Sequence, residues 1–457
     1  HVLYCIKERA CDLDRINAFL NRFLSHERKL RWMRLDNAAK IYPAAKRRKW
    51  NNFFRLSATL CDEVDKTVLR NAMDVTMRRF PSIAVRLCRG AFWYYLEELS
   101  SAPEITDEKS WPLAHTPFES INECALRVIV YKNRIAVEFY HALTDGTGGM
   151  VFLKSLLAEY IEQKYGVEIP NECGVLDRLT QPQEEELEDS FSKNAGSVSV
   201  SRNASTAFKI HYTPERDDFR HLTTFILDSN AALAAAKSCG VSLTVYLTSA
   251  MLLALQRIQD EQTPDKRRQK PIRVVVPVNL RRLFPSRTLR NFVHVIMPEI
   301  DPRMGDYEFS EILTSVKHQL GLLVTKKNLC AMFTPNVNAE RSPLLRVMPL
   351  FLKNIAMKLV YDTVGERTNC LNLSNLGDIK VPDAMRRYVT RFDFILGVQA
   401  TKPNNCGVLS YNGKLYMNFI RNTVEPVLEF QFYQVLRELG LHVKVESNGA
   451  GNVLMPN

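Results

Sequence analysis

The passage from residue 135 to residue 161 constrains the fold most, because one apolar pattern gives way there to another. Ile135, Val137 and Phe139 occupy alternate positions, and this period of two is typical of a strand with one buried face. From Met150 onward the apolar residues recur at helical spacing. They are Met150, Leu153, Leu156, Leu157, Tyr160 and Ile161. The chain must therefore turn from a strand into a helix between these two patterns.

The turn between strand and helix contains His141, Asp145, Gly146 and the pair Gly148-Gly149. The alternation places His141 on the buried face, where an imidazole is either satisfied by partners or used for chemistry. Asp145 stands where helix-capping side chains are found, and the glycines allow a tight turn and close backbone approach. The residues alone leave two interpretations open. One is a satisfied core histidine followed by a capping aspartate, and the other is a reactive histidine.

The length of 457 residues suggests two folding units, and a hydrophobic fraction of 46% is enough for large cores. Strand-like and helix-like segments alternate along the chain, which favours an α/β fold. Composition changes between Gln181 and Ser205, where an acidic run precedes a serine-rich stretch. We therefore expect an N-terminal half at 1–180, a crossover linker at 181–205 and a C-terminal half at 206–457.

The net charge is +11, and the densest basic runs are residues 28–31, 46–49 and 266–270. No zinc-finger, RNA-binding or helix-turn-helix pattern accompanies these runs, and they lie far apart in the sequence. We therefore expect solvated surface there and no nucleic-acid partner. A surplus of positive charge also suits a phosphate-bearing co-substrate or an acidic carrier protein.

The 10 cysteines are scattered and include no C-x-x-C pair, so we expect neither a disulfide framework nor a metal site, and a cytoplasmic location. No segment has the roughly 18–20 uninterrupted apolar residues of a membrane span. The best candidate, 344–361, is interrupted by charges and Pro349. It is predicted to be an amphipathic helix packed on its own domain. Residues 12–26 also have helical spacing.

The motif His-x-x-x-Asp-Gly at residues 141–146 resembles the signature of the chloramphenicol-acetyltransferase-like superfamily. This superfamily includes CoA-dependent acyltransferases, alcohol acetyltransferases and condensation domains of peptide synthetases. Further stretches resemble its other motifs in the same order, and together the resemblance covers residues 34–443. These stretches are Arg34–Pro43, Val276–Arg281 followed by Asn291-Phe292, Ser374-Asn375-Leu376-Gly377, and the Asn-Gly hairpin of Gly407–Phe419.

The resemblance implies two similar halves, each a mixed sheet with packed helices, and an active-site tunnel between them. Many members carry a second histidine just before the motif, whereas this chain has Tyr140 at that position. The difference leans away from condensation domains and toward bacterial alcohol-acetyltransferase-like proteins.

The resemblance also implies roles for individual residues. His141 is expected to be the general base, and Asp145 is expected to be structural, paired with an arginine. Arg281 is the first candidate for that partner and Arg282 the second, although surface charge is the alternative for each. Gly146 is expected to allow the turn that presents His141. Two further residues, Ser374 and Asn375, are candidates for an oxyanion donor, with helix capping or a turn as the alternative.

The expected activity is transfer of an acyl group from acyl-CoA directly to a hydroxyl or amine of a small metabolite, without an acyl-enzyme. The CoA thioester is then a co-substrate, and no metal is expected. Two alternatives stay open: a condensation-like enzyme that uses an acyl or peptidyl carrier protein, and a non-catalytic member that binds a ligand in the same cleft.

Overall fold

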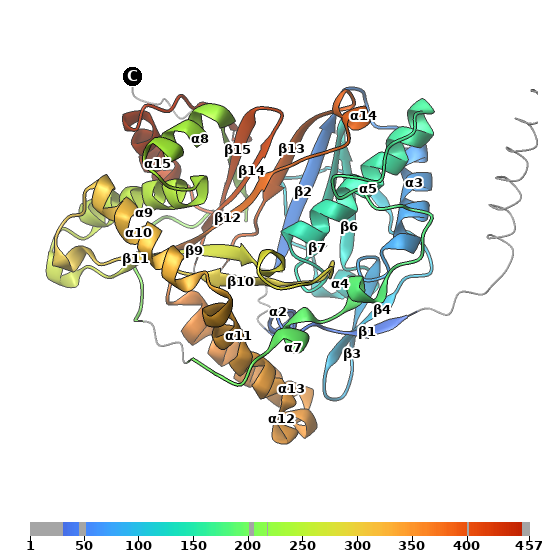
Figure 1. The fold of residues 1–457 in the computed structure, drawn as a ribbon, viewed down its shortest axis with the longest axis horizontal. Helices are drawn as coiled ribbons and strands as arrows, with labels where there is room; N and C mark the ends of the chain where they lie inside the picture. The colour runs from blue at the N-terminus through green and yellow to red at the C-terminus, as the bar shows by residue number, and fades with distance from the viewer. Residues whose placement is uncertain (1–30, 45–51, 201–204, 217, 400–401, 450–457) are drawn as a thin grey trace, which may run out of the picture.

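The computed structural model describes residues 31–44, 52–200, 205–216, 218–399 and 402–449. The helix expected at 12–26, the basic run 46–49 and most of the run 28–31 lie outside this part of the chain. Within it, the chain forms two lobes, each built on a sheet with helices against it (Figure 1). The expected α/β architecture of two mixed sheets is therefore confirmed.

The N-terminal lobe is built on a five-stranded sheet in the order β13-β2-β7-β6-β5. Its central strands β2, β6 and β7 pair antiparallel, and β5 joins β6 in parallel. The bounds of the strands are β2 (Phe53–Leu60), β5 (Ile105–Asp107), β6 (Leu126–Tyr131), β7 (Arg134–Tyr140) and β13 (Val389–Ile395). A separate three-stranded sheet contains β1 (Trp32–Arg34), β3 (Val85–Arg89) and β4 (Tyr94–Glu98).

The C-terminal lobe is built on an eight-stranded sheet with the order β10-β9-β12-β14-β15-β8-β16, and β11 pairs with β9. Strand β12 is parallel to both its neighbours, while the other pairs are antiparallel. The strands are β8 (His221–Asp228), β9 (Ile272–Asn279), β10 (Val293–Ile296), β11 (Glu299–Ile300), β12 (Leu371–Asp378), β14 (Asn404–Tyr411), β15 (Lys414–Arg421) and β16 (Lys444–Ser447).

The helices follow the capping signals of the sequence. Asp145 caps α5 at its start, and Gly166 ends it with φ +66°, a conformation that costs glycine little. The helices of the N-terminal lobe are α2 (Ile41–Ala44), α3 (Lys66–Arg79), α4 (Phe118–Glu123) and α5 (Gly146–Tyr165). Those that follow are α6 (Glu184–Leu187), α7 (Ser190–Asn194), α8 (Ser229–Ser238), α9 (Leu243–Gln262), α10 (Phe309–Leu323), α11 (Lys326–Arg341), α12 (Pro343–Val347), α13 (Leu350–Val360), α14 (Asp383–Arg386) and α15 (Val427–Glu438).

One strand of the N-terminal sheet is supplied by the C-terminal part of the chain. Strand β13 comes from the C-terminal part of the chain, yet it pairs antiparallel with β2 at the edge of the N-terminal sheet. Figure 1 shows β13 beside the blue β2, with β14 continuing from it into the other sheet. Because one continuous stretch of chain enters both sheets, the relative position of the lobes is fixed by backbone hydrogen bonds as well as by side chains.

In the described part of the expected linker, α6 and α7 pack against the body, whereas residues 196–200 are exposed. Glu186 in α6 makes a two-pronged ion pair with Arg79 of α3, with N–O distances of 2.5 and 2.6 Å. The backbone carbonyl of Glu186 also accepts from the N–H of Leu289 at 2.8 Å, and Phe191 in α7 is buried. The segment therefore connects α3 with the stretch that follows β9.

The segment 344–361 differs from its expected form. Pro349 separates it into α12 and α13, and most of its apolar side chains are exposed, so the prediction that it packs on its own domain is wrong for that face. Among the described residues no single helix is long and apolar enough to cross a bilayer, and only the pair α8–α9, bent by 84°, has the length and composition. Most of α9 is buried in the C-terminal core.

Candidate active site

His141 directly follows the C-terminal end of β7, the central strand of the N-terminal sheet. Its backbone N–H donates to the carbonyl of Asn52 at 2.8 Å, which fixes the chain as it leaves the strand. The imidazole stacks on Tyr42 with a centroid distance of 4.6 Å and meets the ring of Phe54 edge-on at 5.1 Å. The residue as a whole is half-buried, and its two aromatic neighbours orient the ring.

One ring nitrogen of His141 has a defined partner. Its Nδ1 lies 3.2 Å from Oδ1 of Asn291, and Nδ2 of Asn291 donates to Asp36 Oδ2 at 3.2 Å. Because the amide gives its N–H to a carboxylate, its oxygen is left to accept from Nδ1–H. The Nε2 atom then carries the lone pair. Burial lowers the pKa of His141, which favours the neutral imidazole that a general base requires.

Asp36 lies behind Asn291 and is fully buried. Its Oδ1 accepts from Ala39 N–H at 2.7 Å, and its Oδ2 lies 3.8 Å from Nε of Arg290. Burial is the main cause that raises the pKa of Asp36 to about 6. Asp36 and Asn291 both stand in motifs that the sequence singled out, but nothing in the sequence indicated that they meet across 255 residues.

Replacing Asn291 with alanine is expected to lower kcat of the acyl transfer proposed below by roughly 10- to 100-fold. The variant loses the acceptor for Nδ1–H, and a hydrogen bond to an ionising group contributes about 1.5–3 kcal/mol. The pH–rate profile measures the effect, because loss of an acceptor that stabilises the imidazolium lowers the pKa of His141 further. A change in melting temperature with an unaltered pH profile would contradict a positioning role.

The raised pKa of Asp36 gives a pH-dependent stability. Between about pH 4 and pH 6 the folded chain holds a proton on Asp36 that the unfolded chain has released, so this contribution is complete below pH 4 and is lost as pH rises through 6. The rise from 3.8 to about 6 corresponds to roughly 3 kcal/mol. In urea titrations, we expect the free energy of unfolding of Asp36→Asn, relative to that of the wild type, to rise by roughly 3 kcal/mol between about pH 4 and pH 6. The same pH dependence of stability in both proteins would contradict this expectation.

The carboxylate of Asp145 is surrounded by four donors. Its Oδ1 accepts from the backbone N–H groups of Thr147 and Gly148 at 3.0 and 3.1 Å, as a helix cap. Its Oδ2 accepts from Phe292 N–H and from Nη1 of Arg281, both at 2.8 Å. Asp145 therefore combines the helix cap expected from the residues with the ion pair to Arg281 that the resemblance implies.

Arg281 is held in the same cluster. Its Nε donates to the carbonyl of Thr288 at 2.8 Å, and its Nη2 donates to the carbonyl of Arg290. The guanidinium therefore connects the start of α5 with the 288–292 stretch that carries Asn291. Arg282, the second candidate, is exposed, in line with the surface-charge alternative.

The glycines of the motif act through close contacts. A Cβ on Gly146 would lie 2.7 Å from the Leu376 side chain, and one on Gly148 would lie 2.1 Å from the carbonyl oxygen of Leu289. Gly146 is the first residue of α5 and does not have the positive φ that a glycine-specific turn requires. The atom close to Gly146 is the flexible end of Leu376, whereas the atom close to Gly148 is backbone, so the steric need for glycine is stronger at Gly148. The expectation that Gly146 allows the turn that presents His141 stays a prediction.

Ser374 and Asn375 point to opposite faces of β12. Leu373 belongs to the C-terminal core, and Asn375 on the same face has its amide engaged, with Nδ2 donating to Thr244 Oγ1 and Oδ1 accepting from Gly377 N–H. The turn alternative therefore accounts for Asn375. Alternation places Ser374 on the other face of the strand, the face from which Leu376 reaches Gly146. Ser374 stays a candidate for an oxyanion donor.

A buried charge cluster lies behind the site. Glu138 of β7 is 1% exposed; it contacts Arg55 at 3.3 Å and also Arg127, and it accepts from Leu113 N–H at 2.9 Å. The Leu113 carbonyl in turn accepts from Arg220, which comes from the C-terminal half. A cavity of about 10 Å³, room for about one water, lies beside it. It is lined by Asn52, Phe53, Leu113, Ala114, His115, Arg220 and Gly397.

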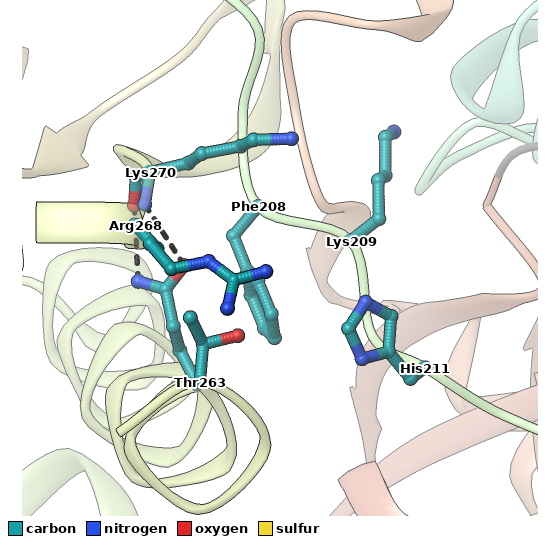
Figure 2. Close-up of a pocket in the computed structure, with 7 residues that line it drawn as sticks. Phe208, Lys209, His211, Thr263, Arg268 and Lys270 are labelled. Atoms are coloured by element: carbon teal, nitrogen blue, oxygen red, sulfur yellow. Dashed lines mark hydrogen bonds between the residues drawn. The ribbon is translucent and has the colours of Figure 1, made fainter. Parts of the chain in front are cut away.

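A larger cavity of about 440 Å³ lies elsewhere, beside the first residue of β9 (Figure 2). Its lining is Phe208, Lys209, His211, Gln259, Thr263, Arg268 and Lys270. The strand that separates it from the His141 site is about 23 Å long at 3.3 Å per residue, and its far end, Asn279, bonds to Thr147. This cavity is therefore distinct from the site, and the tunnel implied by the resemblance stays a prediction.

No protein-family model and no curated protein matches the sequence. Solved structures match its fold. Polyketide synthase associated protein 5 from Mycobacterium tuberculosis aligns with TM-score 0.53 at 12% identity, covering 89% of this chain and 95% of that one. A trichothecene 15-O-acetyltransferase from Fusarium sporotrichioides gives 0.54 at 12%, covering 91% and 95%. The starter condensation domain of rhizomide synthetase with C8-CoA gives 0.55 at 12%, covering 89% and 94%.

These likenesses extend over nearly the whole of each chain, so they concern both lobes and the way the lobes are joined. The similarity expected from the ordered motifs is confirmed at the level of the fold. The chain has the two-lobed fold of these solved structures, which include an acetyltransferase and a condensation domain.

Proposed function

We propose that the chain is an acyltransferase that moves an acyl group from acyl-CoA directly to a hydroxyl of a small metabolite, with His141 as general base. The observation that carries the proposal is the 3.2 Å contact between Nδ1 of His141 and Oδ1 of Asn291, from which the tautomer of the ring follows. Asn291 holds Nδ1, and burial lowers the ring's pKa, so a neutral imidazole presents the lone pair of Nε2. An amine is the second acceptor class that this geometry would serve.

The proposed reaction has two proton transfers through one nitrogen. Nε2 of His141 takes the hydroxyl proton as the acceptor oxygen bonds to the thioester carbonyl carbon. The tetrahedral intermediate then collapses, the C–S bond breaks, and the imidazolium returns the proton to the thiolate, so the products are an ester and CoA thiol. The chain itself forms no covalent bond with the acyl group.

Two charges develop during this reaction, one on the imidazolium and one on the oxyanion, and both must be stabilised. The imidazolium is stabilised by Asn291 Oδ1, whose amide is oriented by Asp36. Ser374, on the face of β12 that is turned toward the motif, is the proposed donor to the oxyanion. Asp145 and Arg281 hold the loop and take no proton, because four donors already surround the carboxylate.

A CoA thioester is the proposed donor substrate. One solved structure of the same fold contains C8-CoA, and another is an acetyltransferase. The net charge of +11 suits a donor that carries phosphates. A carrier-protein thioester would bring the same reacting group, so the assay must distinguish acyl-CoA from acyl carrier protein as the acyl donor.

The test is an assay for thiol release with purified chain, acyl-CoA esters of increasing chain length, and a panel of alcohols and amines. Release that depends on an acceptor, with ester detected by mass spectrometry, is the expected result. Turnover only with an acyl group on carrier protein would select the condensation-like alternative. A chain that binds acyl-CoA in calorimetry and never turns it over would select the non-catalytic alternative.

A further inference from the structure

Helices α12 and α13 carry a face of apolar side chains that the rest of the described chain leaves uncovered. Leu344, Val347, Phe351 and Ile355 are 56–71% exposed, and Leu352 is 43% exposed. Leu344 and Val347 are three residues apart in α12, and Phe351 and Ile355 are four apart in α13, so each pair lies on one face of its helix. We call these four exposed side chains the apolar stripe. Soluble monomers rarely expose contiguous apolar patches of this kind unless the patch binds something.

The opposite side of α13 explains how the two helices are held. Leu350 donates its N–H to the carbonyl of Ala91, and Lys353, 3% exposed, donates from Nζ to the carbonyl of Phe92 at 2.9 Å. The ammonium of Lys353 also lies 3.5 Å from the ring centroid of Trp93. The attachment is therefore complete without the apolar stripe, which faces outward.

Figure 1 shows α12 and α13 projecting from the body, below the sheets. The loop between β3 and β4 lies against them and adds Phe92, which is 47% exposed. Because these apolar and aromatic side chains project from the body, they can insert into an apolar phase while the two lobes keep their positions. We call α12, α13 and this loop the arm.

The positive charge of the arm indicates which kind of partner can cover it. From residue 341 to residue 360 the sequence has four basic residues and no acidic one, and Arg341, Arg346 and Lys358 are exposed. A second copy of the chain would bring the same cations face to face, which disfavours a self-complementary contact. Residues 1–30 contain six Lys or Arg against four Asp or Glu, so they do not complement the charge either.

We propose that the arm is a docking surface for an anionic phospholipid bilayer. An amphipathic helix with Phe and Leu on one face and Lys and Arg beside it binds in the plane of the interface, and negative lipid head groups attract its cations. The arm then lies on the membrane, without spanning it. This proposal is independent of the proposed reaction, because docking requires no turnover.

The experiment is flotation of the full chain with vesicles of phosphatidylcholine containing about a third phosphatidylserine, compared with phosphatidylcholine alone. We expect binding to the anionic vesicles, at least tenfold weaker on the neutral ones, and weaker as salt rises. The variant Leu344→Ser, Phe351→Ser, Ile355→Ser should lose at least 100-fold in affinity. Arg346→Gln with Lys358→Gln should lose roughly 30-fold on anionic vesicles only.

The matched control is Leu179→Ser with Met304→Ser, two apolar residues that are 63% and 82% exposed outside the arm. The control should bind vesicles as the wild type does. All variants change exposed side chains, and equal melting temperatures show that each is folded. Absence of vesicle binding by the wild type overturns the proposal, as does equal binding by the serine variant. If the wild type is a dimer in ultracentrifugation and the serine variant is a monomer, a second copy of the chain covers the arm. That result also overturns the proposal.

Discussion

The variant His141→Ala is expected to lose about 10³-fold in kcat for acyl transfer while its fold is kept. General acid–base catalysis by a positioned side chain contributes about 10²- to 10⁴-fold, and here one nitrogen is proposed to serve both proton transfers. The residue is half-buried, and its removal leaves Tyr42 and Phe54 in place. The loss should therefore be in turnover, with melting temperature and acyl-CoA affinity nearly unchanged.

The pH dependence sharpens this expectation. Burial lowers the pKa of His141 below its ordinary 6.5, so in the wild type the rate should rise with pH and level off below neutrality. The alanine variant should lack this rise. Imidazole added to the assay restores a general base in solution and should recover part of the rate.

The matched control for this prediction is His221→Ala. His221 also has a pKa lowered mainly by burial, and it contacts Glu215 at 3.2 Å in the C-terminal lobe, away from the motif. Its replacement should leave turnover within a few-fold of the wild type. Full activity of a folded His141→Ala would remove His141 from the mechanism.

The sequence predicts those parts of the site that depend on consecutive residues. The strand, the motif and the helix are consecutive, so period and capping residues place His141 and Asp145 without knowledge of the fold. The pairing with Arg281 came from family resemblance, because no property of a single chain links positions 136 residues apart.

The rest of the site depends on contacts between distant segments. Asn291 and Asp36 become partners only when the loop after β9 meets the segment after β1, and each residue alone reads as a turn residue. Strand β13 likewise alternates as any half-buried strand does, and nothing local shows that its partner is β2 of the other lobe. The arm was identified as amphipathic, but a periodic pattern indicates only that one face is apolar, and it does not identify what covers that face.

The second large effect is expected from Asp145→Asn, which should lower stability and activity together. The variant removes the charge opposite Arg281, whose side chain is 12% exposed, while the carboxylate it replaces is 2% exposed. Breaking a buried pair from one side leaves an uncompensated charge and costs about 3–5 kcal/mol. Thermal and urea unfolding measure the loss of stability.

The control for helix capping is Asp228→Asn, since Asp228 caps α8 by accepting from Ala231 N–H at 2.7 Å and has no arginine partner among the contacts described. It should cost less than about 1 kcal/mol, because asparagine caps nearly as well as aspartate. The difference between the two variants then isolates the ion pair from the cap.

A double variant separates a structural role of Asp145 from a chemical one. If the carboxylate serves to balance Arg281, then Asp145→Asn with Arg281→Gln should cost less than the sum of the single changes, since no charge is left buried without its partner. Activity of the folded fraction should recover in parallel, because the loop that carries His141 and the stretch that carries Asn291 regain a neutral contact. A single Asp145→Asn variant that kept its melting temperature and lost all turnover would instead make Asp145 a participant in the reaction, and the four donors around it would need another explanation.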